Sequence, residues 1–110
     1  MKISTLLTKG FISYTKNELL EQDFHGCYIS DLLSNVLRSA KPEEALLTTL
    51  SNMNTVAVAS LSNLPVVIFV EGKIPTKEMI QKANEEEIAL LSTEELSSQV
   101  VKHLIELGAL

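Results

Sequence analysis

The sequence has 110 residues, a formal net charge of −5 and 45% hydrophobic residues, which predicts a single domain, 1–110, with a core of its own. Aromatic residues make up only 5% and Trp is absent, so we expect an aliphatic core. The nine basic residues are scattered, which argues against binding to nucleic acid, and no apolar run approaches the ~18–20 residues that cross a bilayer.

The first third of the chain predicts two extended segments and a helix. A short extended piece is expected at residues 11–14, and residues 24–29 (FHGCYI) have the aromatic and β-branched content of a strand. Residues 30–40 (SDLLSNVLRSA) predict a helix with Ser30 as its N-cap. Its apolar residues share one face: Leu32, Leu33, Val36, Leu37 and Ala40.

The middle of the chain predicts two strands around one helix. Residues 45–50 (ALLTTL) are typical of a strand. Residues 52–64 (NMNTVAVASLSNL) contain TVAVA, which favours a strand by propensity, but the apolar spacing is helical. We therefore predict a helix whose inward residues are Met53, Val56, Ala57, Ser60, Leu61 and Leu64. Residues 66–70 (VVIFV) form a continuous apolar run, typical of a strand buried on both faces.

The last third of the chain predicts a helix, a strand and a final helix. Residues 76–86 predict a helix with Met79, Ile80 and Ala83 inward, and residues 88–91 predict a strand. A helix over residues 92–108 is expected to open with a capping box and to end at Gly108. The capping box is Ser92 and Glu95, and the buried residues are Leu96, Val100, Leu104 and Leu107. The alternating order predicts an α/β domain with a mostly parallel sheet flanked by helices.

Three segments, in this order and spacing, resemble a known family. They are residues 26–40, residues 54–75 (NTVAVASLSNLPVVIFVEGKIP) and residues 83–108. The chain resembles the DRTGG domain and its small stand-alone "serine-kinase-like" relatives, whose fold is similar to the N-terminal domain of HPr kinase. The resemblance covers residues 24–108. It implies a regulatory or interaction domain that forms a homodimer, without a cofactor or a reaction of its own.

The residues that give this family its name are mostly replaced. Its signature positions fall on Asn52, Met53, Val70, Glu71 and Gly72, of which only Gly72 is kept. Asp31 matches the family's turn before the first helix, and Glu87 and Ala89 stand where relatives carry Gly and Pro. The sequence has no G-x-x-x-x-G-K-[ST] loop, so we expect no kinase activity.

Candidate ligand-binding residues follow three of the predicted strands. They are Ser30, Asp31, Asn52, Asn54, Glu71, Gly72 and Lys73. Because the carboxyl ends of parallel strands meet at one edge, these residues are expected to line a shared cleft. Two of these places have a structural alternative: Asp31 would cap the helix that follows it, and residues 70–73 (VEGK) would form a tight turn at Gly72. The carboxylate of Glu71 also opposes binding of a phosphate.

No set of residues predicts catalysis or a metal site. Two histidines, His25 and His103, and one cysteine, Cys27, are too few for a zinc site. Cys27 is expected to be a buried structural residue, and His103 a surface or interface residue. A lone cysteine excludes an intrachain disulfide and is typical of a reducing cytosol, so we expect a soluble, cytoplasmic protein.

Two functional hypotheses follow from the sequence. The first is a non-catalytic regulatory or interaction domain that acts as a homodimer, with a protein partner as a further possibility. The alternative is a sensor that binds a small molecule, a nucleotide or another anion, at the carboxyl edge of the strands. An enzyme is the weakest hypothesis, because no acid, base and nucleophile come together in the sequence.

Overall fold

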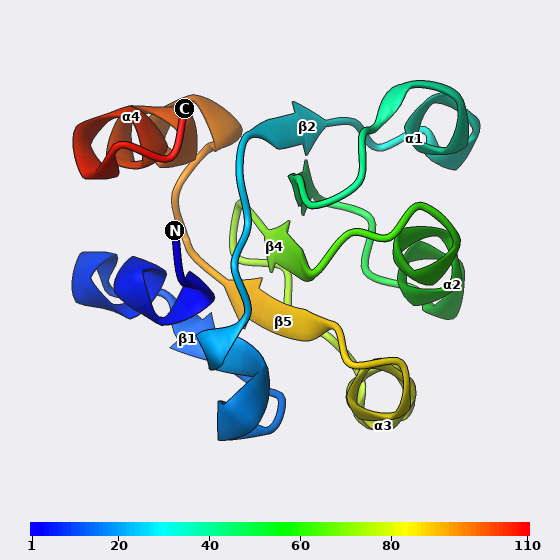
Figure 1. Ribbon diagram of the computed structural model, residues 1–110. Coiled ribbons are helices and arrows are strands. Elements are labelled where there is room, and N and C mark those ends of the chain that lie inside the picture. Colours follow the sequence, from blue (N-terminus) through cyan, green and yellow to red (C-terminus); the bar gives the residue numbers. More distant parts are fainter.

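The computed structural model describes residues 1–110 and places a five-stranded sheet between two layers of helices (Figure 1). The sheet has the order β1-β5-β4-β3-β2. Strands β2 to β5 are parallel, and β1 pairs with β5 in the antiparallel direction. The strands are β1 (Ile12–Ser13), β2 (Cys27–Ile29), β3 (Ala45–Thr48), β4 (Val66–Phe69) and β5 (Ala89–Ser92). The predicted α/β class with a mostly parallel sheet is confirmed.

The helices divide between the two faces of the sheet (Figure 1). Because β2 to β5 follow one another in both sequence and space, their three crossover helices return on the same face. These are α1 (Leu33–Ser39), α2 (Met53–Leu61) and α3 (Lys77–Glu85). The other face is covered by α4 (Ser97–Leu107) and two N-terminal 3-10 helices, η1 (Ile3–Lys9) and η2 (Asn17–Glu21). The sequence pattern did not predict the helices η1 and η2.

The sheet separates two apolar clusters, and β4 contributes to both. Val66 and Ile68 pack in the cluster under α4 and the 3-10 helices, whereas Val67 and Phe69 pack in the cluster under α1, α2 and α3. All four side chains are fully buried. The prediction that this run is a strand buried on both faces is confirmed.

Two helices begin later than the sequence predicted. Ser30 is not the N-cap of α1; its hydroxyl accepts a hydrogen bond from the backbone N–H of Leu32 at 3.0 Å. The predicted capping box at Ser92 is also wrong, because Ser92 is the last residue of β5 and pairs with Phe69. Strand pairing therefore keeps this segment extended, and Gln99 accepts from the N–H of Leu96 at the true start of α4. The predicted end at Gly108 is confirmed, with φ of 83°.

The buried face of α1 is narrower than predicted, and that of α2 lies on a different side of the helix. Of the inward residues predicted for these helices, Leu32, Leu37, Met53, Ala57 and Leu61 are exposed. In α2 the buried residues are Thr55, Val56, Val58 and Ala59. The apolar residues of α2 lie on all sides of the helix. Their spacing therefore predicts a helix but does not indicate which side faces the sheet. None of the helices has the length and apolar content that a bilayer-spanning segment needs.

Candidate functional site

Six of the seven predicted ligand-binding residues lie in three loops at the carboxyl edge of the parallel strands, and Asn54 lies in the first turn of α2. Ser30 and Asp31 follow β2, Asn52 precedes α2 after β3, and the turn at Gly72 follows β4. This placement follows from the parallel register of β2, β3 and β4. The hydrogen bonds of each loop determine which polar groups remain available to a ligand.

Asp31 binds the end of β3 and does not cap α1. Its Oδ1 accepts hydrogen bonds from the Thr48 hydroxyl at 2.8 Å and from the Thr49 backbone N–H at 2.7 Å. Its Oδ2 accepts from the Thr49 hydroxyl at 2.8 Å. The backbone N–H of Thr49 is the main cause that lowers the pKa of Asp31, and the two hydroxyls add to it against the opposing effect of burial. The capping interpretation was wrong because Thr48 and Thr49 offer three donors to this carboxylate.

Asn52 uses its side-chain oxygen to cap α2. The oxygen accepts from the backbone N–H of Asn54 at 2.9 Å and of Thr55 at 3.3 Å. Both N–H groups belong to the first turn of α2. The N–H of Thr55 also donates to the backbone carbonyl of Asn52 at 3.1 Å, whereas that of Asn54 has the side-chain oxygen alone. The exposed side chain of Asn54 makes no hydrogen bond within the chain.

Residues 70–73 form a tight turn whose backbone N–H groups are all occupied. Glu71 and Gly72 have φ of 58° and 77°, and the N–H of Lys73 donates to the carbonyl of Val70 at 3.2 Å. The N–H of Glu71 donates to the carbonyl of Glu95 at 2.9 Å, and that of Gly72 to Thr93 at 3.0 Å. The positive φ expected at Gly72 is confirmed. A phosphate could not be held by these N–H groups, whereas the exposed Lys73 ammonium forms no ion pair within the chain.

Hydrogen bonds join these three loops and the loop after β5, which contains Thr93 and Glu95, into one rim. Asp31 ties the first loop to β3, the Ser51 hydroxyl donates to the carbonyl of Ile74, and Glu71 binds Glu95 through the backbone. The predicted residues therefore share one edge, but most of their hydrogen-bonding groups are satisfied by the protein itself. Ser51, Thr48 and Thr49 have a part in this rim that the sequence analysis did not assign.

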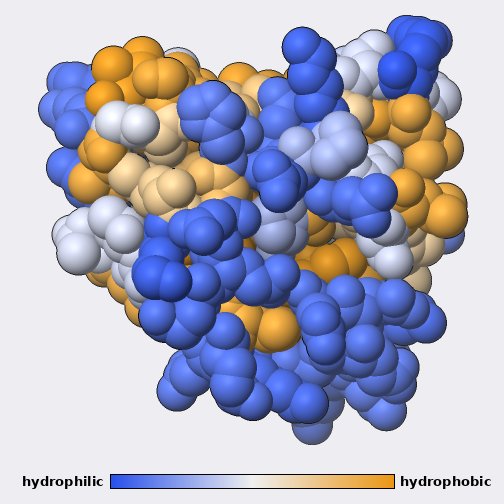
Figure 2. Space-filling model, viewed as in Figure 1, coloured by the Kyte–Doolittle hydropathy of each residue, from blue (hydrophilic) through white to orange (hydrophobic).

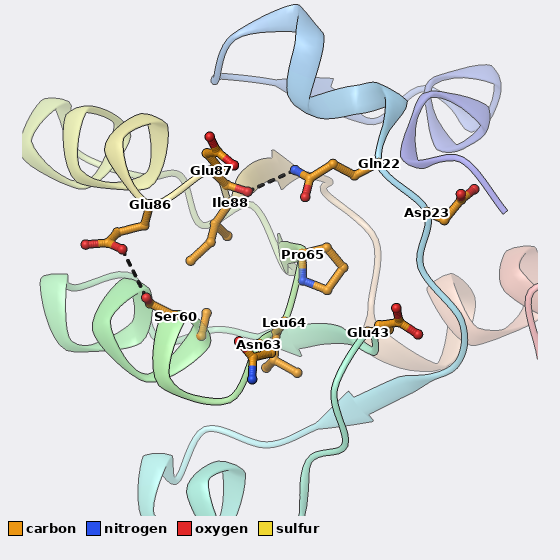
Figure 3. A pocket seen from close by; sticks show the side chains of 11 residues that line it. Gln22, Asp23, Glu43, Ser60, Asn63, Leu64, Pro65, Glu86, Glu87 and Ile88 are labelled. Carbon is orange, nitrogen blue, oxygen red and sulfur yellow. Dashed lines mark hydrogen bonds between the residues drawn. The ribbon is translucent and has the colours of Figure 1, made fainter.

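A hollow of about 590 Å³ lies at the opposite, amino-terminal edge of the sheet (Figure 3). Its lining contains none of the seven predicted residues and comprises Gln22, Asp23, Glu43, Ala59, Ser60, Asn63, Leu64, Pro65, Glu86, Glu87 and Ile88. Two hydrogen bonds cross it, from the Ser60 hydroxyl to Glu86 at 3.2 Å and from the Gln22 amide to the Glu87 carbonyl at 2.9 Å (Figure 3). The four carboxylates make this hollow acidic.

Three residues of the hollow have a left-handed backbone. Glu43, Asn63 and Glu87 have φ of 72°, 56° and 60°. The resemblance places Glu87 where relatives carry Gly, and the φ of 60° at Glu87 is a conformation that favours Gly. The Lys82 ammonium, 3.1 Å from Glu86, and the Ser60 hydroxyl lower the pKa of Glu86. Residues 85–87 are exposed at the end of α3.

Cys27 and His103, the side chains considered for catalysis, have environments typical of structural residues. Cys27 is half-buried, and burial together with the nearby Glu44 raises the pKa of its thiol, which disfavours the reactive thiolate. His103 is more enclosed than predicted: its Nε2 lies 2.8 Å from Glu95, and its ring packs edge-on against Phe11. No group of three or more His, Cys, Asp or Glu residues is placed to hold a metal ion.

Comparison with solved structures finds a regulatory region with the same fold. One matching structure is the crystal structure of the CBS and DRTGG domains of the regulatory region of Clostridium perfringens pyrophosphatase, complexed with the activator diadenosine tetraphosphate. The TM-score is 0.74 at 15% sequence identity, over 90% of this chain. The chain spans 43% of the length of that regulatory region. No curated protein sequence matches the chain.

The family model for the HPr serine kinase N terminus matches residues 47–107. This segment is more than half of the chain and runs from β3 through the end of α4. It contains the crossover helices α2 and α3, the buried strands β4 and β5, and the turn at Gly72. The chain therefore belongs to the family of HPr serine kinase N-terminal domains, and its fold is that of a DRTGG-like domain.

Proposed function

We propose that this protein is a non-catalytic regulatory domain that acts as a homodimer. The observation that carries this proposal is the match in fold, over 90% of the chain, to domains of an enzyme's regulatory region. The placement of Cys27 and His103 supports a non-catalytic role, because the thiol is held protonated and the imidazole contacts carboxylates within the fold. Exposed leucines such as Leu37 and Leu61 support association with a second copy.

The homodimer is tested by sedimentation equilibrium of the full chain at micromolar concentrations. We expect a species of twice the 12.1 kDa chain mass. A single species of 12.1 kDa over the whole concentration range would contradict the homodimer.

The second candidate function is a sensor of a nucleotide or another anion at the carboxyl edge. It is favoured by the exposed Lys73 at this edge, and by the nucleotide activator bound in the structure of similar fold. Because the N–H groups of the turn are occupied, the ligand would be held by side chains. Lys73, Asn54 and the amide nitrogen of Asn52 carry donors that remain free, and the free carboxylate of Glu71 opposes an anion. Ser30, Asp31 and Gly72 lie on the same edge.

The sensor hypothesis is tested by thermal shift with diadenosine tetraphosphate and ATP. Binding to the folded state must raise the melting temperature by mass action. Under this hypothesis Lys73→Ala abolishes the shift and leaves the melting temperature of the free protein unchanged, with Lys102→Ala on α4 as the matched control. Unchanged melting curves for the wild type would contradict the hypothesis.

A further inference from the structure

The outer face of α2 is exposed and uncharged. Between Ala45 and Val70 the sequence contains no Asp, Glu, Lys or Arg, although the chain has 14 acidic and nine basic residues. Met53, Ala57 and Leu61 recur at every fourth position of α2 and are all exposed, Leu61 by 73%. We call these three residues the α2 stripe. An apolar helix face in water indicates a surface that a partner covers.

The neighbours of α2 differ in polarity. On one side α1 adds the exposed Leu37, and on the other side the exposed residues of α3 include Lys77, Glu78 and Glu85. Figure 2 shows apolar patches on the right over α1 and α2, and a hydrophilic surface below them over α3. The apolar surface is therefore confined to α1 and α2 within this layer.

We propose that the α2 stripe binds the α2 stripe of a second copy, with the two helices crossing in antiparallel directions at Ala57. This interface rests on the homodimer proposed above and gives it a location. A two-fold axis through Ala57 sets Met53 against Leu61 of the partner subunit, so each long side chain meets another. The small Ala57 at the crossing lets the two backbones approach closely.

Charge favours this occupant and this direction. Each copy carries −5, so the contact surface that adds least repulsion between two copies is one without charge, as the α2 stripe is. In the antiparallel arrangement α3 also faces α3 of the partner subunit, and these two helices run in opposite directions. The exposed Lys77 at its start then approaches Glu85 of the partner subunit, which a parallel crossing would not achieve.

The outer face of α4 provides the matched comparison. Ile105 is 60% exposed on this helix, but the exposed charges of Lys102 and Glu106 lie beside it. Leu61→Glu and Ile105→Glu therefore make the same chemical change at two exposed apolar helix positions on opposite faces of the sheet. Both variants should fold, because neither residue is buried in the protomer.

Sedimentation equilibrium of the two variants tests the interface, with circular dichroism to verify the fold. We expect Leu61→Glu to raise the dissociation constant of the dimer at least about 100-fold, because two unpaired carboxylates would be buried near the axis. Ile105→Glu should dimerise as the wild type does. A dimer unaffected by Leu61→Glu overturns this interface and leaves the homodimer standing, whereas a monomeric wild type overturns both.

Discussion

The carboxyl edge of the sheet and the α2 stripe use their side chains in opposite ways. At the carboxyl edge, the polar groups of Asp31, Asn52 and the turn at Gly72 bond to the protein itself. On α2, apolar residues that would suit a core remain exposed to solvent. Polar side chains at a sheet edge are therefore not evidence of a ligand until their hydrogen bonds have been traced. Apolar side chains on a helix are likewise not evidence of a core until their burial is known.

If the carboxyl edge is structural, Asn52→Ala should have the largest effect on stability there. The substitution leaves the N–H of Asn54 without its acceptor. It also removes the side-chain acceptor of Thr55, whose N–H keeps its bond to the backbone carbonyl of residue 52. Loss of an N-cap side chain costs about 0.5–2 kcal/mol of unfolding free energy. Urea denaturation measures this loss, and Asn52→Asp, which keeps an acceptor, should recover most of it. Equal stability of Asn52→Ala and the wild type would show that the Asn52 side chain does not stabilise α2.

Gly72→Ala should cost about 1 kcal/mol, because its φ of 77° disfavours a Cβ. The added Cβ would lie 2.8 Å from Oε2 of Glu94, at the flexible end of an exposed side chain that can move away. Gly10→Ala is the matched control, since Gly10 has φ of 84° and no atom near the added Cβ. Thermal or urea unfolding should give similar losses for the two variants. A much larger loss at Gly72 would mean that Glu94 is fixed in place.

Asp31→Asn should cost about 0.5–1 kcal/mol at neutral pH, a value reduced by the exposure of the carboxylate. The pKa of Asp31 is lowered in the folded state, so the carboxylate stabilises the fold above its ordinary pKa. This contribution is lost as the pH falls from about 4 towards the folded-state pKa. Urea unfolding as a function of pH should therefore show wild type and Asp31→Asn converging in acid. A difference that persists unchanged at low pH would contradict the role of the ionised carboxylate.

Lys73→Ala should have the smallest effect, within about 0.5 kcal/mol, because exposed charges without partners add little to stability. Thermal unfolding in the absence of ligand measures it. A marked loss would show that the Lys73 side chain belongs to the structural rim of the carboxyl edge, and would remove it from the groups available to a ligand.

The order of strands and helices could be predicted because it depends on local patterns. The buried run of β4 and the helical spacing of α2 are properties of short segments, and both predictions are confirmed. The start of α4 could not be predicted, because the pairing of Ser92 with Phe69 depends on a distant strand. The orientation of α2 was also beyond the sequence, since a helix with apolar residues on all sides does not indicate which side is covered.

The candidate site could be predicted in position but not in its contacts. Parallel strands bring Asp31, Asn52 and Gly72 to one edge, as their spacing indicated. That Asp31 would bind Thr48 and Thr49, instead of α1, depends on the register of β2 against β3. The acidic hollow at the other edge is formed by residues far apart in the sequence, such as Gln22 and Glu87. No sequence motif predicts it.

The most direct test of the account is disulfide formation between two α2 helices. Ala57→Cys, made in a chain that also carries Cys27→Ser, places one thiol at the proposed two-fold axis. There the Cα atoms of the two copies should come within the ~4.4–6.8 Å that a disulfide bridges. Mild oxidation should then give a covalent species of twice the 12.1 kDa mass, whereas Ile105→Cys in the same background should not. A dimer in which Ile105→Cys cross-links and Ala57→Cys does not would contradict the α2 interface.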